Sequence, residues 1–299
     1  MAFPNIFVSR DEKRLQAGWR ILAFFILYGS ALFILSYLAF RTGFVRLNAD
    51  LSLVSDPVNL LKAKLLDGLA LVAAVYAARR VLDKRGFESL GFQDRQVGRD
   101  LFAGIGIGAG LMGLIFLICL LAGWVNFEGF IWAEESFSEW GFRAFIFLVF
   151  FMLVGLTEEL QFRGYILQNL EDGTGKWGAV ILSSLIFAGF HLRNPDGFKW
   201  MSMAGLALAG LFFAYAYFRT RTLWLAVGLH IGWNFFENQV FGLPVSGLNF
   251  KGLLVHTIDG PEIWTGGAFG PEAGLVLIPA LALGVGLIYF YTRERGVKE

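Results

Sequence analysis

The sequence predicts an all-α membrane protein: a polytopic transmembrane helical bundle of about eight spans with both termini cytoplasmic. Three observations carry this prediction. Hydrophobic residues make up 56% of the 299 residues and charged residues only 16%, whereas soluble globular chains carry about 25% charged residues. Mean hydropathy is +0.60. Apolar runs recur along the chain, and the connections between them differ systematically in basic charge.

Each predicted span is an apolar run close to the length that a helix needs to cross a bilayer. A helix rises about 1.5 Å per residue, so a hydrocarbon core of about 30 Å requires roughly 20 residues. We expect spans at about 18–40, 61–82, 101–124, 143–169, 177–193, 200–219, 222–241 and 273–291. The second run is the least apolar, because Lys62, Lys64 and Asp67 occupy its first turns.

The distribution of Lys and Arg predicts the orientation. With the N-terminus inside, 17 of the 25 basic residues fall in cytoplasmic segments and 8 outside, as the positive-inside rule requires. The chain is therefore expected to form a single integral-membrane domain over residues 1–299. Within it, residues 83–100 form a basic cytoplasmic linker at the membrane interface, and residues 242–272 form an outer loop.

Composition also excludes some classes of function. A net charge of +1 gives no sign of a nucleic-acid partner. The apolar spans predict membrane lipid as the surroundings. A single cysteine, Cys119, cannot form an intrachain disulfide. The run from Gly108 to Gly113 matches the GxGxxG dinucleotide pattern, but it lies in an apolar span with no preceding strand. Gly104 and Gly108 are instead expected to pack against another helix.

Three apolar segments each carry polar side chains that hydrocarbon penalises. A charged group at the bilayer centre costs roughly 2.5–3.5 kcal/mol on insertion scales. Such residues usually face one another inside a bundle, so the pattern predicts an intramembrane active site. The residues concerned are Glu158, Glu159 and Arg163, then His191, then His230 and Asn234.

Helical spacing assigns a role to each acidic residue. Glu159 and Arg163 are four residues apart, which favours an ion pair that supports the site. Glu158 points about 100° away around the helix, which leaves it available as a general base. His230 and Asn234 share one helix face, and Glu237 lies one turn further along it.

Two mechanisms fit these residues. In one, Glu158, His191 and His230 hold a divalent metal such as zinc that activates water. In the other, Glu158 and His191 polarise water directly, and His230 and Asn234 donate hydrogen bonds to the oxyanion. Asparagine is a poor zinc ligand and a good oxyanion donor, which favours the second mechanism.

The three motifs resemble those of the CPBP family of intramembrane proteases, which includes the type II CAAX prenyl endopeptidases and the bacterial Abi proteins. The matching patterns are Glu158-Glu159-x-x-x-Arg163, Phe187-x-x-x-His191 and His230-x-x-x-Asn234, within a core of residues 140–240. The resemblance implies an intramembrane glutamate or metallo-endopeptidase in a multi-pass protein, with the inner membrane of a prokaryotic cell as the expected location. It also implies a peptide or protein substrate, prenylated or membrane-embedded.

Two alternatives to a peptidase stay open. The first is a non-catalytic membrane scaffold, or a bacteriocin-immunity-type protein, that retains the protease fold. The second is a small transporter that uses the same polar residues as a proton relay. The sequence lacks the internal symmetry and the paired broken helices that such transporters have, which disfavours the second.

Overall fold

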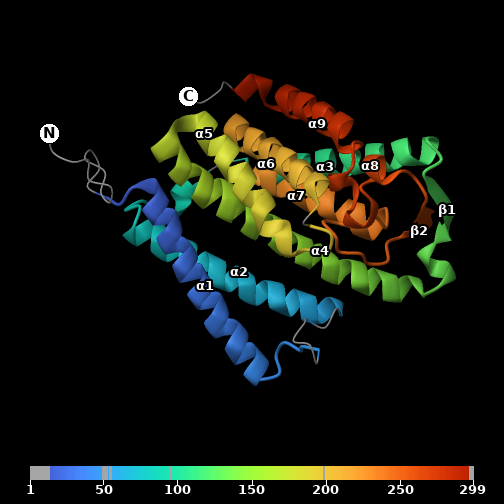
Figure 1. The fold of residues 1–299 in the computed structure, drawn as a ribbon, viewed down its shortest axis with the longest axis horizontal. Helices are drawn as coiled ribbons and strands as arrows, with labels where there is room; N and C mark the ends of the chain where they lie inside the picture. Colours follow the sequence, from blue (N-terminus) through green and yellow to red (C-terminus); the bar gives the residue numbers. More distant parts are fainter. Residues whose placement is uncertain (1–13, 49–52, 54–55, 94–95, 198, 296–299) are drawn as a thin grey trace. The chain divides into compact units, whose positions relative to one another are not determined.

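The computed structural model describes residues 14–48, 53, 56–93, 96–197 and 199–295 (Figure 1). Most of these residues are helical, which confirms the all-α class, and a single two-stranded sheet is added among the described residues. The chain forms two compact units. The first comprises residues 1–93 and 156–183, and the second residues 94–155 and 184–299. Both predicted cytoplasmic ends, residues 1–13 and 296–299, lie outside the described residues.

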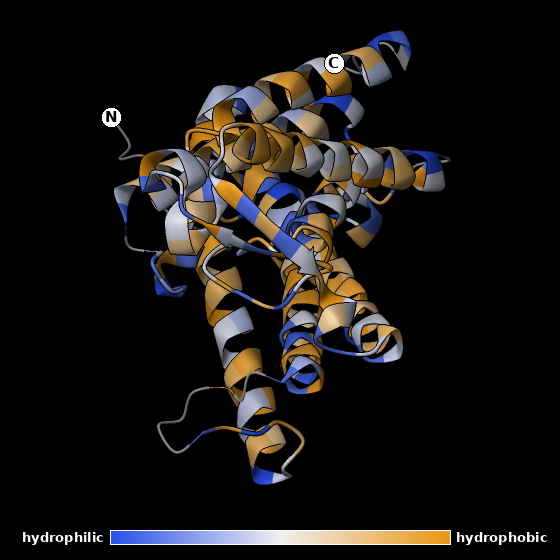
Figure 2. Ribbon diagram, turned by 90° about the vertical axis from the view of Figure 1, so that its right-hand side faces the viewer, coloured by the Kyte–Doolittle hydropathy of each residue, from blue (hydrophilic) through white to orange (hydrophobic). Residues whose placement is uncertain are grey.

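Length and hydropathy identify the helices that can cross a membrane. Within the described residues, four helical segments qualify: Ala17–Arg41, Val97–Leu121, Phe137–Arg193 and Trp200–Thr220. The apolar helix Leu277–Thr292 is shorter. In Figure 2 the long helices are predominantly hydrophobic along their length, and the hydrophilic colour gathers at helix ends and connections. The protein is therefore an integral membrane protein with an all-α fold.

The first unit contains the helices α1 (Ala17–Arg41) and α2 (Pro57–Val81), which pack along each other. Helix α2 begins four residues before the predicted boundary because its N-terminus is capped. The Asp56 side chain accepts a hydrogen bond from the Asn59 backbone N–H at 3.0 Å, and Pro57 occupies the first turn. The earlier start moves Lys64 and Asp67 away from the helix end.

Three consecutive helical segments, joined without a loop, carry the first motif. Helix α4 (Phe137–Glu159) passes into a π-helical turn, η3 (Leu160–Ile166), and then into α5 (Leu167–Phe190). Gly175 interrupts α5 with a φ of 72° and a ψ of 174°, a conformation that glycine adopts at low cost. This break falls at the predicted gap between the spans 143–169 and 177–193.

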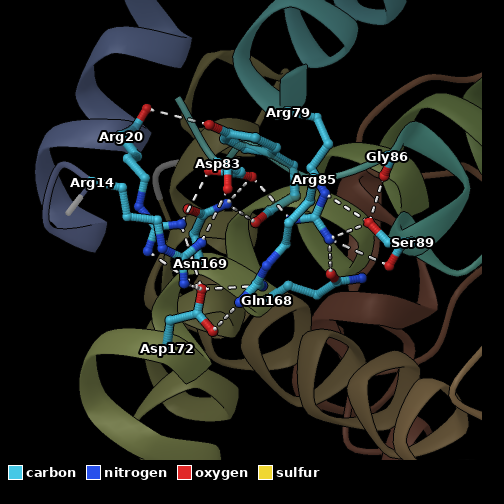
Figure 3. Close-up of polar contacts among 11 residues, drawn as sticks. Arg14, Arg20, Arg79, Asp83, Arg85, Gly86, Ser89, Gln168, Asn169 and Asp172 are labelled. Atoms are coloured by element: carbon cyan, nitrogen blue, oxygen red, sulfur yellow. Dashed lines mark hydrogen bonds and ion pairs between the residues drawn. The ribbon is translucent and has the colours of Figure 1, made fainter. Parts of the chain in front are cut away.

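A buried ion network joins the elements of the first unit (Figure 3). The Asp83 carboxylate, with a side chain 0% exposed, lies 3.0 Å from the Arg20 guanidinium and 2.9 Å from that of Arg79. The Asn169 amide of α5 donates to Asp83 at 3.3 Å. Asp172 pairs with Arg20 at 3.3 Å. The network therefore ties the start of α1 and the end of α2 to the first turns of α5.

The second unit is built around α3 (Val97–Leu121), α6 (Trp200–Thr220), α7 (Trp224–Phe235) and α9 (Leu277–Thr292). Helix α7 continues into a π-helical turn, η5 (Phe236–Val240). The apolar core between these helices includes Leu111, Ile115, Phe212, Leu229 and Ala280, which are almost completely buried. The same unit holds the residues of the second and third motifs.

The predicted outer loop, residues 242–272, contains the strand β2 (Leu254–Ile258). This strand pairs antiparallel with β1 (Val125–Phe130), with Val125 opposite Ile258 and Phe130 opposite Leu254. A cavity of about 280 Å³ lies beside the pair and is lined by residues that include Phe250, Lys251 and His256. The loop is thus ordered and lines a cavity, although the strand pairing is an addition to the prediction.

Candidate active site

The first motif forms a buried ion pair in the first unit. Glu159 Oε1 lies 3.0 Å from Arg163 Nη1, and the two side chains are 0% and 1% exposed. Two charges buried this deeply are stable only as a hydrogen-bonded pair, because each alone would keep its full desolvation cost. The pair of Glu159 with Arg163 therefore has a structural role, as the spacing of four residues predicts.

Glu158 has a different environment from its neighbour. Its side chain is half-buried, whereas Glu159 is fully buried. The motif also lies where α4 gives way to the π-helical turn η3. Single π-helical turns inside α-helices are rare and are frequent at functional sites. The sequence pattern does not reveal this turn, because its residues read as an ordinary apolar helix.

The second motif ends α5 with an imidazole held by the backbone. His191 Nδ1 lies 2.9 Å from the Phe187 carbonyl oxygen. A carbonyl only accepts, so Nδ1 carries the proton, and in the neutral ring Nε2 is the atom that can accept one. His191 is half-buried and begins the short helix His191–Arg193, so its side chain is partly exposed.

Aromatic rings bring the second and third motifs together in the second unit. Phe187 has its ring centroid 4.8 Å from that of His191 and 6.5 Å from that of His230. Phe213 of α6 stacks on His230, with centroids 4.9 Å apart and planes at 17°. His230 is 4% exposed. The two imidazoles thus lie in the same apolar environment. Phe213 is part of this environment, although the sequence pattern does not single it out.

Glycines set the position of α7, the helix that carries His230 and Asn234. Gly104 and Gly108 of α3 lie so close to α7 that an added Cβ would be 2.5 Å from the carbonyl oxygens of Leu225 and Leu229, respectively. Gly228 and Gly232 of α7 return the contact: an added Cβ would lie 2.1 Å from Leu101 O or 2.3 Å from Ile105 O.

This arrangement confirms the predicted packing of Gly104 and Gly108. The partner pair on α7 also has the small-x-x-x-small spacing that allows close backbone approach, so the sequence contained a signal for it. Helix α4 approaches α7 closely as well, since a Cβ on Gly155 would lie 3.0 Å from Ile231 Cγ1.

Asn234 and Glu237 follow His230 along α7 and into η5. Asn234 is 9% exposed and Glu237 is 0% exposed. The carboxyl group of Glu237 adjoins that of Glu272, a residue of the outer loop to which Ser246 donates hydrogen bonds from its backbone N–H and its hydroxyl, both at 3.1 Å. Burial raises the pKa of Glu272 to about 7. Nothing in the sequence pattern pairs these two distant glutamates.

The side chains available as ligands indicate how a metal ion could be held at the site. Among the described residues, no group of three or more His, Cys, Asp and Glu side chains is arranged to hold a metal ion. In the second unit, His191 and His230 supply two nitrogen donors, whereas catalytic zinc sites use three protein ligands. The third candidate ligand, Glu158, belongs to the first unit.

The six predicted site residues fall into two groups. Glu158, Glu159 and Arg163 belong to the first unit, and His191, His230 and Asn234 belong to the second. The structure describes the ion pair within the first group and, within the second, two imidazoles that each lie near the Phe187 ring.

Comparison with known families agrees with the motifs. Residues 139–236 match the family described as type II CAAX prenyl endopeptidase Rce1-like. This match supports the CPBP family of intramembrane proteases and spans all three motifs. No curated protein and no solved structure matches the chain.

Proposed function

We propose that this protein is an intramembrane endopeptidase that cleaves near the C-terminus of a prenylated, membrane-embedded protein, using a water molecule activated by Glu158. The observation that carries the proposal is the family match over residues 139–236, which includes every motif residue. The eight spans, the cytoplasmic termini and the inner membrane of a prokaryotic cell belong to the same proposal.

Hydrolysis needs a base, an oxyanion site and a proton for the leaving group. Glu158 takes a proton from water, whose oxygen attacks the scissile carbonyl carbon. His230 and Asn234 donate hydrogen bonds to the oxyanion that forms. Glu158 then returns the proton to the leaving amine nitrogen as the C–N bond breaks. His191 orients the water through Nε2, the nitrogen that its bond to the Phe187 carbonyl leaves unprotonated.

Packing inside each unit supports these roles. The ion pair of Glu159 with Arg163 holds the helical turn that carries Glu158. In the second unit, Gly155 of α4 contacts Ile231 of α7. Along the chain, Glu158 follows Gly155 by three residues and His230 precedes Ile231 by one. A divalent metal held by Glu158, His191 and His230 would supply Lewis-acid activation of the same water.

The decisive variant is Glu158→Gln, which keeps the shape of the side chain and removes its basicity. Purified protein in detergent is assayed on a quenched peptide that ends in a prenylated cysteine and three further residues. We expect cleavage to fall by at least about 100-fold, the lower range for general-base catalysis, with unchanged thermal unfolding. Glu134→Gln, on the surface, is the matched control. A Glu158→Gln enzyme that cleaves like the wild type would exclude this mechanism. Inactivity of the wild type as well would favour a non-catalytic scaffold.

A further inference from the structure

A polar cluster in the first unit has no part in the proposed mechanism. The Tyr28 hydroxyl of α1 donates to one oxygen of the Asp67 carboxylate on α2. The Lys64 ammonium lies 2.8 Å from the other oxygen. The side chains of Lys64 and Asp67 are 15% and 24% exposed. Both oxygens of Asp67 are therefore engaged, while the ammonium keeps partial access.

The cluster lies near the middle of two long helices. Helices α1 and α2 have 25 residues each, so each is about 37 Å long. Of the two, α1 is also apolar enough to qualify as a membrane span. Tyr28 and Asp67 each fall close to the centre of their helix. Apolar residues of similar volume usually stabilise a buried site as well as an ion pair does. An ion pair kept between two helices, where apolar side chains would serve as well, therefore points to a functional role.

Packing within the first unit places the cluster beside the first motif. A Cβ on Gly68, the residue after Asp67, would lie 3.3 Å from the Thr157 side chain, the residue before Glu158. Tyr28 is also within electrostatic range of Glu158. The cluster and the proposed general base thus share one region of the unit.

Lys64 is the member of this cluster that can receive a ligand. An ammonium group has three N–H donors, and the contact with Asp67 engages one of them. Arg163, the cation of the neighbouring motif, is bound to Glu159 and is 1% exposed. Asp67 and Tyr28 fix the position of the Lys64 ammonium, and its remaining donors suit an anion.

We propose that Lys64 is a specificity-determining residue that binds the C-terminal carboxylate of the peptide substrate. This inference rests on the proposed function. A C-a-a-X terminus places the α-carboxylate three residues after the prenylated cysteine, which is about 10 Å of extended chain. A carboxylate in apolar surroundings needs a charged partner. Binding the chain end would set the distance from that end at which the enzyme cuts.

The test compares two matched peptides, each with a farnesylated cysteine followed by three residues. One ends in a free carboxylate and the other in a carboxamide. We expect wild-type kcat/KM to favour the free acid by about 10- to 100-fold, the range for a hydrogen bond to a charged group. In Lys64→Gln this preference falls to near one, and Lys64→Arg restores most of it. Tyr28→Phe, which loosens Asp67, lowers the preference partway.

Lys62→Gln is the matched control, because Lys62 lies two residues along α2, over the Phe44 ring at 5.2 Å from its centroid. Its acid preference should equal that of the wild type. A wild-type enzyme that cleaves acid and amide equally overturns the inference and leaves the proposed function standing, even if no Lys64 variant folds. A preference that persists in folded Lys64→Gln also overturns it. Failure of the wild type to cleave either peptide removes the proposed function and the inference together.

Discussion

Gly228 offers a direct test of how α7 is held in place. A methyl group at this position points into the backbone of α3, where an added Cβ would lie 2.1 Å from the Leu101 carbonyl oxygen and 3.1 Å from Gly104 Cα. The atoms that oppose it are main-chain atoms, which cannot move aside by changing rotamer. Gly228→Ala therefore forces the two helices apart.

The size of the effect follows from these distances. To bring the Cβ from 2.1 Å to at least 3.0 Å from Leu101 O, α7 must retreat by about 0.9 Å. A gap of this size forfeits a quarter to a half of the dispersion energy of each contact it opens. Overpacking a close contact typically costs about 1–3 kcal/mol. The better helix propensity of alanine returns up to about 1 kcal/mol. We expect a net loss of about 1–2 kcal/mol.

The free energy of unfolding can be measured by titrating the detergent-solubilised protein with SDS and following tryptophan fluorescence. Gly106→Ala is the control on α3, because an added Cβ there meets no heavy atom of the described residues within 4 Å. It should unfold like the wild type or slightly later. Peptide cleavage by Gly228→Ala should fall by about 10- to 100-fold, because misplacement of about 1 Å is enough to do this. Equal stability and activity of Gly228→Ala and the wild type would refute this account of the α3–α7 contact.

Two further predictions concern buried charge. Asp83→Asn leaves Arg20 and Arg79 without their shared carboxylate, so thermal unfolding should reveal a loss of about 3–5 kcal/mol. Glu134→Gln, in an exposed pair, should cost less than about 1 kcal/mol, and similar losses in both would contradict the ion network. Burial raises the pKa of Glu272 from an ordinary value near 4.5 to about 7, so the folded chain retains a proton that the unfolded chain releases. Stability should therefore fall by about 3 kcal/mol as pH rises from about 4.5 to 7. Glu272→Gln should flatten this profile, and an unchanged slope would exclude the assignment.

Local spacing explains which parts of the structure the sequence predicts. The pair of Glu159 with Arg163 depends on residues one helical turn apart. The same spacing places Gly104 and Gly108 on one face of α3, although it does not identify α7 as their partner. The turn at Gly175 falls where the apolar pattern is interrupted. In each case the helical period along the chain is sufficient to predict which side chains share a face or where a helix is interrupted.

Contacts between distant segments could not be predicted in this way. Asp83 lies in a segment that reads as a charged linker, yet its partners come from α1, α2 and α5. Phe213 resembles every other phenylalanine of an apolar span until it is found against His230. The π-helical turns after Glu159 and Phe235 also leave no mark in the hydrophobic period. Such features depend on which helices become neighbours, and a single sequence does not specify that.

The hydrogen bond between His191 and the Phe187 carbonyl has a consequence for evolution. Because the acceptor is main chain at the end of a helix, no substitution of the side chain at position 187 removes it. Many histidine bases depend on a carboxylate partner that a single mutation can delete. Here the choice of tautomer is built into the way α5 ends. The side chains around His191 can therefore diversify for new substrates while the tautomer of His191 stays the same.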